Sequence, residues 1–314
     1  MISYDVSGRT VTITHPDRVL FPDDGLTKAD LAAYHHAVAG AMLPHLVDRP
    51  LMLQRFPGGL GGEWFYQKEA GRGVAGWIRT VEVAKEGGTV RHPVVDDEAS
   101  LLALTNLSTI SFHRWTSRAD QPDRPDLMVV DLDPSTDDFA EVRQAARWTR
   151  EVLHDLDLAC YLLTTGSRGV HVTVPLDRSA DTETVAGFAE DLARLLAASH
   201  DDDLTVETRK ASRRGRLYVD TARNGWAQTV IAPYSVRPRP GAPVAAPITW
   251  EELDYPALRP DGWTIATMPA RLAGGDPWSG MHRHARAINP TRRRRLDRLA
   301  AAAHPPSTGE PYTD

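Results

Sequence analysis

Hydrophobic and polar residues alternate along several short stretches of the chain, and longer stretches carry apolar residues at helical spacing. Alternation places every second side chain on one face of a strand, whereas apolar residues three or four apart share one face of a helix. The sequence therefore predicts strands at Val11–Thr14, Leu51–Phe56, Ile78–Ala84, Val90–Val95, Asp126–Leu132, Cys160–Thr165, Val170–Pro175, Leu217–Asp220 and Gln228–Ala232. It predicts helices at Asp97–Leu107, Phe139–Leu156, Thr182–Ser199 and, behind a capping Thr27, to about Leu46.

These elements do not follow the regular strand–helix alternation of a parallel sheet, and two of the strands form a hairpin. The pattern favours an α+β core, and 314 residues suffice for one large domain or two packed lobes. Pro and Gly become frequent from Pro233 onward, where we expect irregular structure. The stretch from Arg283 to Arg298 reads as a basic helix, either a solvated face or a phosphate-binding one. We expect a single domain over residues 1–303 and a disordered tail over 304–314.

Composition narrows the possible classes of protein. No stretch approaches the roughly 20 apolar residues of a membrane helix, and the first 18 residues do not resemble a secretory signal. Cys160 is the only cysteine, which excludes intrachain disulfides and cysteine-rich zinc sites. We therefore expect a cytoplasmic protein without a membrane partner. The net charge is −6, but acidic and basic residues are segregated along the chain, which allows a basic groove.

The first chemical signal is a pair of acids at the end of an apolar strand. Asp131 and Asp133 are two residues apart, so their carboxylates share one face of that strand. Close carboxylates repel each other and are stabilised by a hard divalent cation such as Mg²⁺ or Mn²⁺. Asp220, at the end of another predicted strand, is the candidate third acid. The alternative is that the two acids merely end the strand and open a turn, as Asp-Pro often does.

The second signal is the turn between two predicted strands, whose sequence is Thr-Thr-Gly-Ser-Arg-Gly-Val-His over residues 164–171. Glycines allow backbone amides to approach an anion, and the Arg168 guanidinium matches phosphate oxygens. Thr165 and Ser167 add hydroxyl donors, and His171 lies two residues into the following strand. The segment can form a cradle for a triphosphate, or it can be an ordinary β-hairpin turn.

The order of these motifs resembles that of the archaeo-eukaryotic primases, most closely the polymerase domain of bacterial DNA ligase D and its stand-alone relatives. The resemblance rests on Asp131-Leu132-Asp133, then Ser167 to His171, then Asp220. Further matching segments are His15–Pro22 with Thr27–Asp30, Asn106–His113 and Ala232–Arg237.

This resemblance implies a two-lobed fold around a central mixed or antiparallel sheet, with a catalytic half like an RNA-recognition motif. It also implies that three aspartates hold two metal ions, Mn²⁺ or Mg²⁺, and that a further set of residues contacts the incoming nucleotide. The metal set is Asp131, Asp133 and Asp220. The nucleotide set is Thr165, Ser167, Arg168, His171 and Arg237, with His113 nearby.

The resemblance also assigns residues to DNA. Phe65 matches an aromatic residue that stacks on a template base, although a core position fits the pattern equally well, and Lys68 closes the same segment. Lys28 and Arg18 match basic residues that hold a 5′-phosphate across a gap. Arg18 and Arg168 stand where lysine is common in the family, and Thr165 where serine is common.

The implied function is template-directed addition of nucleotides, with ribonucleotides preferred, to gapped, broken or overhanging DNA in repair, including non-homologous end joining. The 314 residues contain no Lys-x-Asp-Gly motif of a ligase nucleophile, so sealing is expected from a separate ligase, with Ku as a further candidate partner. Two other functions are compatible with the motifs. One is a non-catalytic module that binds DNA ends, and the other is a metal-dependent phosphoesterase.

Overall fold

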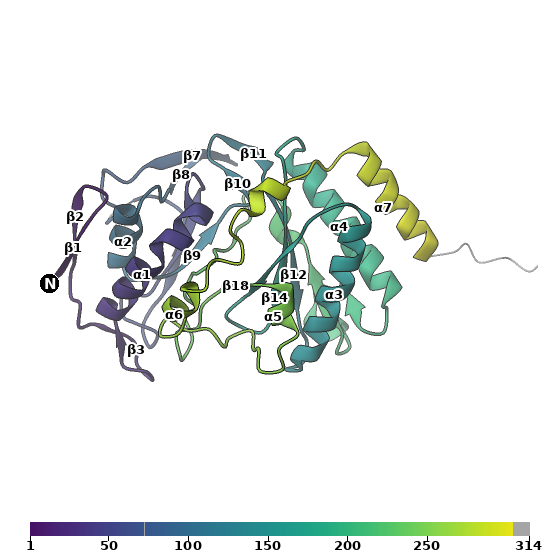
Figure 1. The fold of residues 1–314 in the computed structure, drawn as a ribbon. Coiled ribbons are helices and arrows are strands. Elements are labelled where there is room, and N and C mark those ends of the chain that lie inside the picture. The colour runs from purple at the N-terminus through teal and green to yellow at the C-terminus, as the bar shows by residue number, and fades with distance from the viewer. Residues whose placement is uncertain (72, 304–314) are drawn as a thin grey trace, which may run out of the picture.

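The computed structural model describes residues 1–71 and 73–303 and places them in two lobes side by side (Figure 1). The prediction for residues 304–314 falls outside the described residues. An N-terminal lobe lies on the left of Figure 1, a C-terminal lobe lies on the right, and the chain crosses between them more than once. None of the helices in the described part is long and apolar enough to cross a membrane.

The N-terminal lobe is built on a four-stranded antiparallel sheet in the order β17-β9-β5-β6. Its strands are β5 (Leu51–Arg55), β6 (Phe65–Gln67), β9 (Thr109–Arg114) and β17 (Val230–Ile231). Leu51, Leu53, Ile110 and Phe112 on one face are fully buried and share a core with α1 (Lys28–Leu46) and α2 (Glu98–Asn106). The helices therefore cover this face and leave the other for the space between the lobes.

Helix α1 begins where the sequence predicts. The Thr27 hydroxyl accepts a hydrogen bond from the Asp30 amide, and the Asp30 carboxylate accepts one from the Thr27 amide. This capping box satisfies two backbone donors that the first helical turn leaves free. Three hairpins surround the lobe. They are formed by β1 (Ile2–Val6) with β2 (Arg9–Ile13), β3 (Val19–Phe21) with β4 (Leu26–Thr27), and β7 (Thr80–Lys85) with β8 (Gly88–Pro93).

The C-terminal lobe contains a six-stranded sheet in the order β15-β16-β12-β14-β13-β18. Its central strands are β12 (Leu127–Asp133), β13 (Tyr161–Thr164), β14 (Val170–Pro175) and β16 (Leu217–Asp220), and the two-residue strand β15 (Leu204–Thr205) lies at one edge. Helix α3 (Phe139–Asp155) joins β12 to β13, and α4 (Thr182–Ser199) follows β14. This βαββαβ order is the split βαβ arrangement of RNA-recognition motifs, so the predicted α+β fold and its catalytic half are confirmed.

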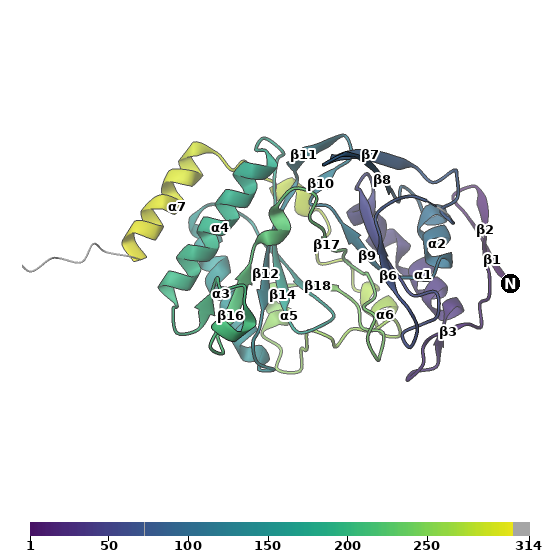
Figure 2. The same cartoon turned by 180° about the vertical axis from the view of Figure 1, so that it is seen from behind.

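Alternation along β12 decides which residues face the helices and which face the other lobe. Met128, Val130 and Leu132 are fully buried in the core formed with α3 and α4. The alternate residues of the strand, which include Asp131 and Asp133, therefore face the space between the lobes. Figure 2 shows α3, α4 and α7 on the side of this sheet away from the N-terminal lobe.

The chain beyond Pro233 contains more regular structure than expected. It forms β18 (Ala246–Ile248), which pairs with β13, and the short helices α5 (Trp250–Leu253) and α6 (Met268–Leu272). Packing against the sheet edge provides hydrogen-bond partners that the local Pro-rich and Gly-rich sequence does not suggest. The buried Trp278 indole N–H donates a hydrogen bond to the Leu162 carbonyl of β13. This bond attaches the chain segment around Trp278, which crosses between the lobes, to the C-terminal sheet.

The basic C-terminal helix also begins later than predicted. Residues Met281–His284 form a single 3-10 turn, and α7 covers Pro290–Ala303, not Arg283–Arg298. The Asn289 side chain accepts the Arg292 amide, so Asn289 and Pro290 supply the helix start. Arg292 and Arg293 are engaged with Asp157 and Asp191, which ties the basic residues nearest the start of α7 to the C-terminal lobe.

Candidate active site

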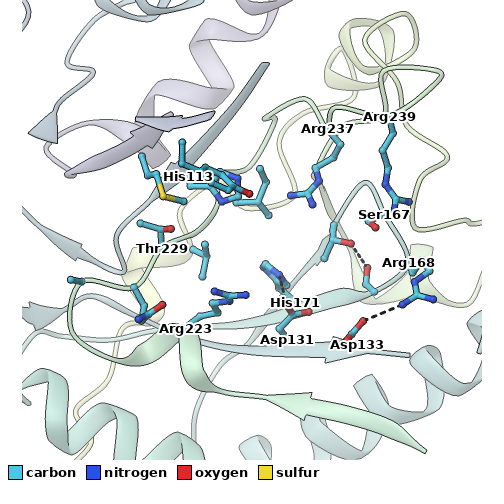
Figure 3. A pocket seen from close by; sticks show the side chains of 18 of the residues that line it. His113, Asp131, Asp133, Ser167, Arg168, His171, Arg223, Thr229, Arg237 and Arg239 are labelled. Atoms are coloured by element: carbon cyan, nitrogen blue, oxygen red, sulfur yellow. Dashed lines mark hydrogen bonds and ion pairs between the residues drawn. The ribbon is translucent and has the colours of Figure 1, made fainter. Parts of the chain in front are cut away.

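The two lobes enclose a cavity of about 830 Å³ that is lined from both sides (Figure 3). The N-terminal sheet contributes Met52, Tyr66 and His113 from its uncovered face. The C-terminal sheet contributes Asp131, Asp133 and His171 and the turn that precedes β14. The segment from Arg223 to Ile231, which ends in β17, closes one side, and Arg237 and Arg239 close another.

The three predicted acids lie on adjacent strands. Asp131 on β12 is directly opposite Asp220 on the antiparallel strand β16, and Asp133 follows two residues later. Directly opposed residues project from the same face, about 4.5–5.5 Å apart at Cβ. The register therefore brings together three acids on two strands, although Asp131 and Asp220 are 89 positions apart in sequence.

The carboxylates themselves do not form a closed cluster. Asp133 accepts from the Arg213 guanidinium at 2.9 Å and lies 3.8 Å from Arg168. Asp220 does not line the cavity, and its carboxylate accepts the Ala222 amide at 2.9 Å. Within the described residues, no group of three or more His, Cys, Asp or Glu side chains is arranged to hold a metal ion. The backbone thus brings the acids together, but their side chains are held by other partners.

Asp131 and two histidines form the centre of the cavity. The Asp131 carboxylate lies 3.5 Å from His171 Nε2. Burial raises the pKa of Asp131, but His171 and the nearby arginines outweigh it and hold this pKa below its usual value. Burial, reinforced by Arg237 and Arg223, lowers the pKa of His113 to about 3, so this imidazole is neutral at pH 7. The buried His113 Nε2 and His171 Nδ1 atoms have no hydrogen-bond partner among the described residues.

The predicted turn faces the acids. Thr165, Ser167, Arg168 and Gly169 all line the cavity with Asp131 and Asp133. Two glycines set its shape: a Cβ on Gly169 would lie 2.3 Å from the Leu132 carbonyl oxygen, and Gly166 has φ +66°. The Thr165 hydroxyl donates to the Gly169 carbonyl at 3.0 Å and is therefore engaged within the turn.

Positive charge dominates the cavity wall. Six lysine and arginine residues line it against two carboxylates. Sequence reasoning identified Lys68, Arg168 and Arg237 but missed Lys210, Arg223 and Arg239. It also missed Met52, Tyr66 and Thr229, because isolated residues on different loops and strands carry no motif that could reveal their convergence. The excess of positive charge suits a highly anionic ligand.

The residues predicted to bind DNA are distributed over two faces of the N-terminal sheet. Lys68 lines the cavity, but Phe65 does not; its neighbour Tyr66 does. Phe65 is directly opposite Arg55, whose guanidinium lies over its ring at 5.2 Å, on the face away from the cavity. Its side chain is 44% exposed, so the alternative of a core aromatic is wrong. Stacking by Phe65 on a template base stays a prediction.

Lys28 and Arg18 lie together near the start of α1. The Lys28 amide donates to the Arg18 carbonyl at 2.8 Å. The Lys28 ammonium is largely buried and donates to the Thr14 carbonyl at 2.8 Å, and Arg18 donates to the Pro57 carbonyl at 2.6 Å. Burial, followed by the charges of Arg18 and Arg55, lowers the pKa of Lys28 to about 8. The buried Lys28 ammonium beside the less buried Arg18 and Arg55 is a place where an anion would relieve repulsion.

Comparisons with known proteins agree with this geometry. A profile of the family described as the LigD primase-polymerase domain matches residues 27–278. The multifunctional non-homologous end joining DNA repair protein LigD of Mycobacterium tuberculosis is 32% identical over 98% of the chain, and LigD of Pseudomonas aeruginosa is 32% identical over 92%. The alignments span 42% and 35% of those relatives, so the chain corresponds to less than half of their length.

A solved structure is similar over almost its whole length. The polymerase domain of Mycobacterium tuberculosis ligase D in complex with DNA superposes with a TM-score of 0.82 and 31% sequence identity. The superposition covers 88% of this chain and 99% of that domain. The family match, the relatives and the shared fold agree, and the chain belongs to the LigD primase-polymerase domain family.

Proposed function

We propose that this protein is a nucleotidyltransferase that adds nucleotides to the 3′ end of a primer on broken or gapped DNA during non-homologous end joining. One observation carries the proposal. Asp131, Asp133 and the Ser167–His171 segment line a single cavity in a chain that belongs to the LigD primase-polymerase domain family. The structural relative was solved with DNA, which supports DNA as the second substrate.

The donor set fits hard divalent cations. Asp131, Asp133 and Asp220 supply only oxygen ligands from one face of two adjacent strands, and Mg²⁺ and Mn²⁺ prefer such oxygens. These three carboxylates would hold the ions once Asp133 exchanges Arg213 for metal. Two bound ions would favour the deprotonated primer hydroxyl and neutralise the pyrophosphate that leaves.

The remaining lining residues suit the nucleotide itself. Arg168 and Arg237 offer guanidinium donors to the phosphates, and Ser167 offers a hydroxyl. Neutral His113 donates or accepts a hydrogen bond without adding charge. The six cations of the wall balance the charge of a triphosphate beside two carboxylates. In the transfer the primer 3′ oxygen forms a new bond to the α-phosphorus, the bond between the α-phosphorus and the oxygen bridging to the β-phosphate breaks, pyrophosphate leaves, and the hydroxyl proton passes to water.

Replacing one acid tests the proposal. We predict that Asp131→Ala abolishes primer extension on single-nucleotide-gapped DNA, by at least about 10³-fold, while DNA affinity changes less than threefold. Asp155→Ala, an exposed acid at the end of α3, is the matched control and should extend normally. Extension by Asp131→Ala at the wild-type rate would exclude the assignment.

The same assay separates the two rival functions. A wild-type protein that binds DNA ends but incorporates no labelled ribo- or deoxynucleotide with Mn²⁺ would be a binding module. Steady shortening of labelled DNA without nucleotides would indicate a phosphoesterase. Comparing ribo- with deoxynucleotides on gapped, overhanging and unprimed DNA tests the predicted ribonucleotide preference, and adding Ku or a separate ligase tests those partners.

A further inference from the structure

A second cavity, of about 500 Å³, lies beside the first and has a different chemical character. The two share a wall: Arg237 and Arg239 line the first cavity, whereas Pro238 and Pro240 between and after them line the second. Strand β5 connects them as well, because Met52 faces the first cavity and Gln54, two residues on, faces the second. The two cavities are therefore neighbours on the same face of the N-terminal sheet.

The second cavity is suited to a flat, neutral group. Among the described residues that line it there is no Lys, Arg or His, and Asp23 is its one charged side chain. A phosphate would meet no positively charged side chain there, whereas six lysine and arginine residues line the first cavity. Trp64 and Phe56 form an aromatic wall, with ring centroids 5.8 Å apart and planes inclined by 19°. Phe56 covers the indole only in part, since Trp64 is 51% exposed.

Gln54 supplies a polar group inside this apolar site. Its side chain is only 7% exposed, lines the cavity, and takes part in none of the side-chain hydrogen bonds found within residues 1–71 and 73–303. The Gln54 amide oxygen and nitrogen are not among the fully buried, unpartnered side-chain atoms of the described residues, so they are reachable from the cavity that Gln54 lines. Its carbonyl and amino groups can together pair with the edge of a nucleobase, as glutamine does with adenine.

We propose that the second cavity receives an unpaired nucleobase of the template strand, stacked on Trp64 and hydrogen-bonded by Gln54. The base is the neighbour of the one that pairs with the nucleotide in the first cavity, because the cavities share the wall at residues 237–240. The site is separate from Phe65, which lies on the opposite face of β6. This inference rests on the proposed function, since it requires a template strand in the cleft.

Binding to templates with single abasic positions tests the inference. Fluorescence anisotropy would be measured on labelled primer–template DNA without nucleotide or metal, with the abasic site moved one position at a time along the single-stranded template. Loss of one stacked base costs the wild type about tenfold in affinity at one position. Trp64→Ala should bind the intact template about tenfold more weakly and lose that position dependence, and Gln54→Leu should reduce it.

Two further variants serve as controls for the effect of Trp64→Ala. Trp64→Phe keeps an aromatic ring and should restore the position dependence. Trp77→Ala, a control for a 39% exposed tryptophan that packs under Arg9, should retain the full wild-type profile. Circular dichroism confirms folding, which Trp64→Ala should preserve because the residue is half exposed.

The outcomes distinguish this inference from the proposed function. A wild type that extends primers but shows no abasic position dependence, or a Trp64→Ala variant that retains it, overturns the second site alone. A wild type that neither binds nor extends DNA overturns both.

Discussion

Gly169 offers a test of whether the turn must be held close to the acids. It stands at the end of the Ser167–Gly169 segment, and a Cβ placed on it would lie 2.3 Å from the Leu132 carbonyl oxygen. Real Cβ atoms essentially never approach closer than 3.0 Å, so the turn or strand β12 must move by at least 0.7 Å in Gly169→Ala. Leu132 lies between Asp131 and Asp133, and the shift therefore changes the spacing of the turn and the acids directly.

The size of the effect follows from this displacement. Misplacing reacting groups by about 1 Å costs about 10²-fold in rate, so we expect Gly169→Ala to lower kcat/KM for gap filling about 30- to 100-fold. Overpacking costs about 1–3 kcal/mol of stability, which a domain of this size tolerates. Single-nucleotide gap filling gives kcat/KM, and thermal melting by circular dichroism gives the stability.

A glycine with room around it provides the matched control. Gly187 lies within α4, and nothing lies within 4 Å of a Cβ built on it. Gly187→Ala should leave gap filling unchanged and stabilise the protein by about 0.5–1 kcal/mol, because alanine favours the helix. If Gly169→Ala fills gaps within twofold of the wild type, the turn is not a positioning element and the reasoning fails.

Two further predictions concern buried charges. Burial raises the pKa of Asp126, but the ion pairs with Arg49 and Arg118 outweigh burial and lower this pKa to about 2. The contribution of ionised Asp126 to stability is therefore present above pH about 4 and is lost as the pH falls towards 2. Asp126→Asn should therefore cost about 3–5 kcal/mol at pH 7 by urea denaturation, with the deficit shrinking at low pH; a constant deficit would contradict this. The pKa of Lys28 is lowered to about 8, so its ammonium loses its charge as the pH rises above that value. The preference for 5′-phosphorylated over 5′-hydroxyl gaps should therefore fall by up to tenfold per pH unit above about 8. A preference that does not change with pH would exclude Lys28 from phosphate binding.

Local sequence determined most of the elements of the fold. The capping Thr27, the apolar spacing of α3 and α4, the continuous apolar run of β12 and the alternation of β14 each specify a structure within a few residues. The strand β9 inside the N-terminal sheet was not predicted, although Ile110 and Phe112 alternate with polar residues in the manner of a strand. Strand β18 and the late start of α7 depend on partners elsewhere in the chain.

The motifs at residues 131–133 and 165–171 could be found from sequence because each is contiguous and contains its own chemistry. Tertiary structure alone decided which other residues join them. Arg223 and Arg239 line the cavity, and Phe65 faces away from it. Arg213 donates a hydrogen bond to the Asp133 carboxylate. The physical reason is that strand register and lobe packing, not sequence separation, set which side chains meet. A shift of one residue in register would send Phe65 or Asp133 to the opposite face of its sheet, whereas lobe packing places Arg213, Arg223 and Arg239, which lie outside the strands.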